Sequence, residues 1–218
     1  DSSILTITSG VSGENLTLTG SGILGAASAG SQTITNNNTL ALADGTGLAS
    51  NYTLTGATIN VTINPRTLNV TLSREYDGTT TVSGALLTPT FDSLQGGETL
   101  ALSGTGSVAS ADVGSSKAVT LGTIVLAAGS GNPSNYTLNS ASMDVNQRVI
   151  NLDGIRAYDA TTNVLSSDIN TFGNIVSGET LTVSGTGSVP TNSVEMNKVI
   201  TLGSFCLLYT SDAADEED

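Results

Sequence analysis

Apolar and polar residues alternate along most of the chain, in short runs separated by glycine and asparagine. Runs in which every second residue is apolar begin at Leu68, Leu100, Val119, Tyr136 and Met143. Alternation of period two places apolar side chains on one face of a β-strand, and the threonine, valine and isoleucine of these runs pack well on a pleated surface. A helical period is missing. The pattern therefore predicts an all-β protein built from short strands, six or seven of them in each repeating unit.

The same segments return along the chain at a nearly constant distance. A Gly-Glu turn segment occurs three times, and its acids Glu14, Glu98 and Glu179 lie 84 and 81 residues apart. A second segment, Ser-Asn-Tyr-Thr-Leu, starts at Ser50 and again at Ser134. Recurrence at such a period is the signature of tandem structural modules. Each module is about 82 residues long.

A third recurring segment is a Tyr-Asp-Gly turn that returns as Tyr-Asp-Ala. Its residues are Tyr76, Asp77 and Gly78 in one copy and Tyr158, Asp159 and Ala160 in the other. Asp-Gly is a turn dipeptide, since glycine adopts positive φ angles at little cost. We therefore expect strained backbone at Ala160 if it follows the conformation of Gly78.

These markers divide the chain into three repeats and a tail. The first repeat covers residues 1–66 and begins inside a module, the second covers 67–148 and is complete, and the third covers 149–205 and stops inside a module. We expect small β-sandwich-like modules joined end to end. The alternative is a β-helix solenoid, which favours the same residue types. The segment 206–218 breaks the repeat and resembles translated sequencing adapter, so we expect it to be non-native and unpacked.

Composition narrows the classes of function. The chain has 6 Lys and Arg against 19 Asp and Glu. Nucleic-acid binding requires clustered cations, so we expect no nucleic-acid partner. There is no histidine, and Cys206 is the single cysteine, which excludes the usual zinc sites. The acids Asp112, Asp144 and Asp153 are scattered, so we expect no calcium site and no cofactor. No apolar run is long enough for a membrane span, so we expect no membrane insertion.

The recurring polar residues are interpreted as structural. A single glutamate follows glycine in each repeat, so a pair of catalytic carboxylates is not expected, and Glu14, Glu98 and Glu179 are predicted at turns or strand edges. Tyr52, Tyr76 and Tyr136 are predicted to supply scarce core area, with hydroxyls that reach solvent or backbone. The sequence predicts no catalytic residue and no enzymatic activity. The structural motif residues are Asn51, Tyr52, Tyr76, Asp77, Gly78, Asn135, Tyr136, Tyr158 and Asp159.

The order of these markers over residues 1–205 resembles the YDG domain. The segments that carry the resemblance are Tyr76-Asp77-Gly78-Thr79-Thr80, Gly97-Glu98-Thr99-Leu100, Gly104-Thr105-Gly106 and Asn135-Tyr136-Thr137-Leu138. This domain occurs in tandem in large bacterial adhesins, including exoproteins similar to filamentous haemagglutinin that use two-partner secretion. The third repeat departs from the pattern at Ala160.

The resemblance implies a secreted protein or one attached to the bacterial cell surface, associated with the outer membrane. Its expected function is that of a repetitive stalk or spacer in an adhesin, with neighbouring repeats as its contacts. The parent protein would contact a host-cell or surface glycan or protein. The alternative is that each module binds a carbohydrate or a protein, which would require an exposed aromatic platform.

Overall fold

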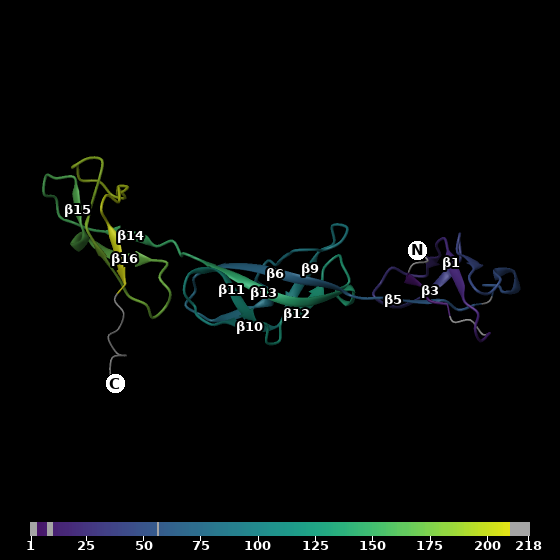
Figure 1. The fold of residues 1–218 in the computed structure, drawn as a ribbon. Helices are drawn as coiled ribbons and strands as arrows, with labels where there is room; N and C mark the ends of the chain where they lie inside the picture. The colour runs from purple at the N-terminus through teal and green to yellow at the C-terminus, as the bar shows by residue number, and fades with distance from the viewer. Residues whose placement is uncertain (1–3, 8–10, 56, 210–218) are drawn as a thin grey trace, which may run out of the picture. The chain divides into compact units, whose positions relative to one another are not determined.

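A computed structural model describes residues 4–7, 11–55 and 57–209, with the side chain of Tyr209 excepted. The all-β prediction is confirmed, because the regular elements of these residues are strands and three-residue 3-10 turns arranged in several small sheets (Figure 1). Most strand pairs are antiparallel and are distributed over several small sheets, unlike the rungs of the alternative β-helix.

The elements follow the three repeats. Those of the first repeat are β1 (Leu16–Thr19), β2 (Ile23–Leu24), β3 (Gly30–Asn36), β4 (Ala41–Asp44), η2 (Ala49–Asn51) and β5 (Asn60–Ile63). Those of the second are β6 (Arg66–Glu75), β7 (Thr81–Ser83), η3 (Gly84–Leu86), β8 (Thr90–Phe91), β9 (Leu100–Ser103), β10 (Thr105–Val108), β11 (Gly114–Thr120), β12 (Val125–Ala128), η4 (Pro133–Asn135) and β13 (Tyr136–Asn146). Those of the third are β14 (Asn151–Gly154), β15 (Asn163–Leu165), η5 (Ser166–Asp168), β16 (Ile169–Gly173), β17 (Leu181–Ser184), β18 (Thr186–Ser188) and β19 (Cys206–Tyr209).

A six-stranded sheet of order β7-β10-β11-β13-β6-β8 forms the centre of the second repeat. Its two longest strands, β6 and β13, are neighbours and run parallel. The parallel direction follows from side-chain hydrogen bonds, since Asn69 accepts from Ser140 at 2.7 Å and Thr71 accepts from Ser142 two residues further along each strand. The second repeat contains eight strands, more than the six or seven expected, because a strand as short as β8 has only two residues and shows no alternating run.

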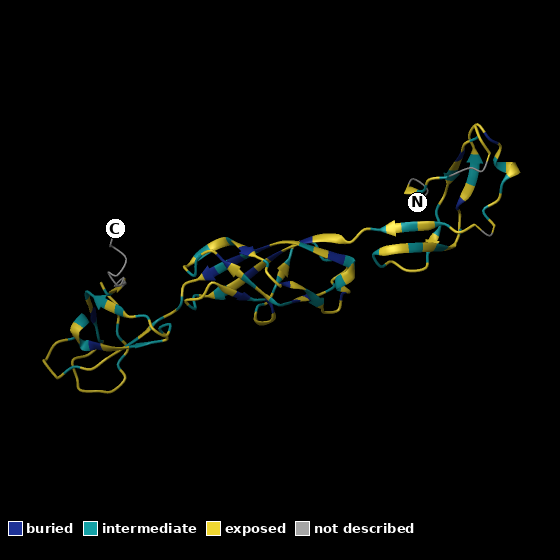
Figure 2. Cartoon of the chain, turned by 90° about the horizontal axis from the view of Figure 1, so that it is seen from below, coloured by how far each residue is buried: buried dark blue, intermediate teal, exposed yellow. Residues whose placement is uncertain are grey.

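The core lies mainly in the second repeat. Figure 2 shows the buried residues concentrated on its strands. Leu68, Val70 and Leu72 alternate along β6 and are at most 2 % exposed, while Met143 and Val145 alternate along β13 at 0 % and 2 %. Period-two alternation therefore does direct these side chains to one face, as expected from the sequence.

One strand pair recurs with the same register in all three repeats. Leu16 pairs with Asp44 in β1 and β4, Leu100 with Ala128 in β9 and β12, and Leu181 with Tyr209 in β17 and β19. The last pair corrects the expectation that the tail beyond residue 205 is unpacked. Residues 206–209 form a ladder with β17, since an apolar Cys-Leu-Leu-Tyr run suits a strand. Residues 210–218 lie outside the described residues, and the non-native origin of the tail stays a prediction.

The chain divides into two compact units whose limits differ from those of the sequence repeats. One unit contains the first repeat and most of the second. The other contains the segment that starts at Val145, which includes the third repeat. It also contains two loops of the second repeat, Glu75–Thr79 and Ser110–Ser115. The Tyr-Asp-Gly loop at 76–78 thus belongs to the same compact unit as the repeat that follows it.

Candidate functional site

A tyrosine hydroxyl donates to the recurring glutamate in both of the first two repeats. Tyr52 donates to Glu14 Oε2, and Tyr136 donates to Glu98 Oε2, across the same separation of 38 residues. The Tyr136 hydroxyl also accepts from the backbone N–H of Gln95 at 3.3 Å. This tyrosine therefore holds the Gly-Glu turn at both of its ends, because the Glu98 N–H already closes the turn on the Gln95 carbonyl at 2.9 Å.

The pairing explains the surroundings of the glutamate. Glu98 is half-buried, and a Cβ on Gly131 would lie 2.9 Å from its Oε2, so this neighbour must stay small. The hydrogen bond to the Glu98 carboxylate, with the burial of the ring, raises the pKa of Tyr136, although the Gln95 N–H opposes the shift. The pair keeps the phenol protonated and donating.

Tyr136 is 8 % exposed, which confirms its predicted place in the core. The prediction for its hydroxyl was incomplete, because the hydroxyl contacts a carboxylate as well as the backbone. The glutamates do lie at turns, as predicted, but their tyrosine partners were not predicted. The missed signal was that Gly-Glu and Asn-Tyr recur with the same separation in both repeats.

The third glutamate is contacted from the Tyr-Asp-Gly loop. The Tyr76 hydroxyl donates to Glu179 Oε1. A Cβ on Gly78, whose φ is +72°, would lie 2.9 Å from Val176 Cγ1 of the same Gly-Glu turn. Arg148 completes the contact by donating to the Tyr76 carbonyl at 3.3 Å and to the backbone and side-chain oxygens of Asn174 at 2.7 and 2.8 Å.

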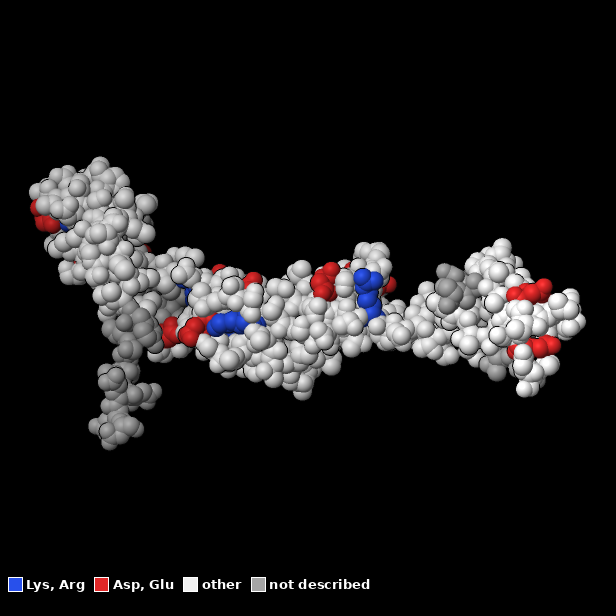
Figure 3. Space-filling model, viewed as in Figure 1, with Lys and Arg blue, Asp and Glu red and all other residues white. Residues whose placement is uncertain are grey.

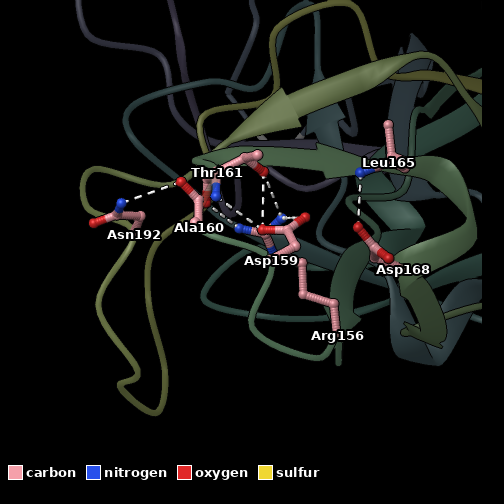
Figure 4. A network of polar contacts seen from close by, with 7 residues as sticks. All are labelled: Arg156, Asp159, Ala160, Thr161, Leu165, Asp168 and Asn192. Atoms are coloured by element: carbon pink, nitrogen blue, oxygen red, sulfur yellow. Dashed lines mark hydrogen bonds and ion pairs between the residues drawn. The ribbon is translucent and has the colours of Figure 1, made fainter.

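The aspartate of the Tyr-Asp-Gly segment organises its own turn. Asp77 accepts from the backbone N–H and the hydroxyl of Thr79, both at 3.0 Å. Asp159 makes the equivalent bonds to Thr161 at 2.9 Å, and Arg156 donates to it at 2.8 Å (Figure 4). The Thr161 N–H is the main cause that lowers the pKa of Asp159, with Arg156 adding to it. These are Asx turns, and their local bonds give both aspartates a structural role.

Ala160 has a φ of +61°, as expected from its correspondence with Gly78. An alanine in this left-handed region costs about 1 to 2 kcal/mol, partly offset by the greater freedom of glycine in the unfolded chain. We therefore predict that Ala160→Gly stabilises the third repeat by roughly 0.5 to 1 kcal/mol, measured by thermal denaturation of the full chain. Gly78→Ala is the matched control and should lower stability. A melting temperature that does not rise in Ala160→Gly would contradict the strain.

The asparagines at 51 and 135 precede the paired tyrosines at the ends of 3-10 turns. Asn51 donates its N–H to the Leu48 carbonyl, and Asn135 donates to that of Asn132. The Asn135 side chain also accepts from the N–H of Ala29 at 2.8 Å, a contact between the first and second repeats. Tyr158 is 64 % exposed and therefore contributes little to the core of the third repeat.

Beside the Tyr76 contact lies a hollow of about 560 Å³ with a mixed apolar and polar lining. Among the residues that line it are Tyr76, Val113, Arg148, Ile150, Val176 and Glu179.

Charged side chains are scattered over a largely uncharged face (Figure 3). Over the described ranges, no group of three potential metal ligands occurs and no helix is long and apolar enough to cross a membrane.

Comparison with known families identifies the central part of the chain. The family model of the YDG domain matches residues 59–143, a range that contains the six-stranded sheet and the Tyr136–Glu98 pair. No curated protein and no solved structure matches the chain.

Proposed function

From the YDG domain at residues 59–143 we infer that the chain is a spacer segment of a secreted or surface-attached bacterial adhesin, without catalytic activity. The observation that carries this proposal is the parallel course of β6 and β13, the first and last strands of the second repeat. Because parallel neighbours start at the same end, the chain enters this repeat at one end and leaves it at the other. The ten residues of β6 give about 33 Å of travel.

Antiparallel terminal strands would return the chain to its starting point, and tandem copies would then gain little reach. A repeat with parallel terminal strands passes the chain onward, which suits a stalk. Tandem copies of such a repeat would add length with each copy, without a change of fold.

The exposed side chains support a spacer over a binding module. Among the aromatic side chains that the structure describes, Tyr158 is exposed, whereas Tyr52, Tyr76 and Tyr136 donate to glutamates. A single exposed ring is not the platform that carbohydrate binding by stacking would require. We propose that contact with host or surface glycans or proteins belongs to other parts of the parent adhesin.

Small-angle scattering of the full chain tests this function. A compact protein of 218 residues has a radius of gyration of about 17 Å. If the first and third repeats also pass the chain onward by about 33 Å, as β6 and β13 do in the second, the radius of gyration is roughly 25 to 30 Å. We expect a radius of gyration of roughly 25 to 30 Å. A value near that of the compact protein would contradict the spacer, and specific binding of a glycan would favour the alternative of a binding module.

A further inference from the structure

The Tyr-Asp-Gly loop of the second repeat makes its contacts with the third repeat. Tyr76 donates to Glu179. Gly78 lies so close to Val176 that a side chain at position 78 would displace the valine side chain. Arg148, at the boundary between the two repeats, donates to oxygens on both sides of the contact. The loop residues Glu75–Thr79 accordingly fall in one compact unit with the third repeat.

The contact surface has the composition of a small docking site. Aliphatic side chains of Val113, Ile150 and Val176 line the hollow beside the Tyr76 ring, and the Tyr76 hydroxyl and the Glu179 carboxylate form its polar centre. Glu179 is half-buried, like Glu14 and Glu98, so the hydrogen bond is partly shielded from water. A phenol that donates to a shielded carboxylate forms a charge-assisted bond, which is stronger than a neutral one.

The exposure of the corresponding tyrosine supports the same interpretation. Tyr158 occupies the position of Tyr76 in the third repeat and belongs to an Asx turn of the same kind. Tyr76 is half-buried, whereas Tyr158 is 64 % exposed and has no following repeat among the described residues. Tyr76 is thus half-buried beside the repeat that follows, in which Glu179 accepts its hydrogen bond.

A glutamate can accept from both kinds of tyrosine. The tyrosine of the same repeat donates to one carboxylate oxygen in the Tyr136–Glu98 pair, and Tyr76 donates to one carboxylate oxygen of Glu179. An ionised carboxylate offers about four lone-pair positions over its two oxygens, so the two bonds do not compete. A complete repeat can hold its internal pair and dock onto the preceding loop at once.

We propose that the Tyr-Asp-Gly loop is a docking site whose partner is the Gly-Glu turn of the next repeat. The proposal deepens the spacer function and rests on it, because a tandem neighbour is the partner. It also gives the Tyr-Asp-Gly loop a role, which is to couple successive repeats. Its test reads a local contact and is therefore independent of the radius of gyration.

Hydrogen exchange on the full chain, read by mass spectrometry, tests the docking site. The variants are Tyr76→Phe, Glu179→Ala and the double variant. In each single variant, we expect amides of segments 75–79 and 174–181 to exchange about five- to tenfold faster, as for the loss of one partly shielded hydrogen bond to a charged group. The double variant should exchange no faster than the faster single variant, because both changes remove the same contact.

Two matched controls distinguish docking from a general loss of stability. Tyr136→Phe removes the equivalent hydroxyl inside the second repeat and should accelerate segments 95–100 and 130–138 instead. Tyr158→Phe should leave every segment at the wild-type rate. Three results would each overturn the proposal. The first is wild-type exchange at 174–181 in Tyr76→Phe, and the second is acceleration confined to the second repeat. The third is that the effects of the single variants multiply in the double variant.

Discussion

Tyr136→Ala should lower the melting temperature of the second repeat by about 12 °C or more, on the scale of large aromatic truncations in a domain of this size. The Tyr136 ring packs with Leu68 and Leu100 in the core, against the partly buried Phe91 and Leu126. Its removal leaves a cavity and also frees the Gly-Glu turn that its hydroxyl holds. The measurement is thermal denaturation of the full chain followed by circular dichroism.

Two controls separate the ring from the hydroxyl and from the strand. Tyr136→Phe keeps the ring and should cost much less than the truncation. Thr137→Ala changes an exposed position on the opposite face of β13 and should melt within a few degrees of wild type. If Tyr136→Ala melts like Thr137→Ala, the tyrosine is not part of the core that holds this repeat together.

Gly104→Ala should cost about 2 to 5 kcal/mol, since it combines backbone strain with overpacking. Gly104 has a φ of +84°, and a Cβ there would lie 2.1 Å from the Thr123 carbonyl oxygen. The obstacle is backbone, which cannot move aside as a flexible side chain does. A Cβ on Gly20 or Gly185 would lie 2.0 or 2.3 Å from the equivalent carbonyl oxygens of Thr39 and Ser204. The effect is measured by chemical denaturation of the full chain.

Gly97→Ala provides the matched control for Gly104→Ala. Gly97 has a φ of +75°, but nothing lies within 4 Å of the position of a Cβ. Its substitution should therefore cost only the strain, about 1 kcal/mol. Equal losses in the two variants would show that the close approach to Thr123 does not constrain this repeat.

Local patterns predicted those features that local chemistry determines. The alternation at Leu68 and Met143 placed both side chains in the core, and the correspondence of Ala160 with Gly78 led to the expected positive φ. Turn conformations and strand faces depend on neighbouring residues, so a single sequence carries this information.

Partners distant in the chain were not predicted. Period-two alternation assigns side chains to faces but says nothing about which strands are neighbours, so the parallel pairing of β6 and β13 was not foreseen. The Tyr136–Glu98 bond joins two markers that were interpreted separately. The Tyr76–Glu179 bond crosses a repeat boundary that the sequence markers treat as a limit between modules.

The parallel pair also has a mechanical consequence. When the two ends of the second repeat are pulled apart, β6 and β13 are loaded in opposite directions along their lengths. Their shared hydrogen bonds must then break together rather than one after another. A spacer that holds an adhesin away from a surface experiences this direction of load.

Single-molecule stretching of the full chain by its two ends tests the spacer account most directly. The roughly 80 residues from the start of β6 to the end of β13 span about 280 Å when extended, against about 35 Å when folded. We predict one discrete unfolding event that lengthens the chain by about 250 Å. A gradual extension without this event, or a series of shorter low-force steps, would contradict the account.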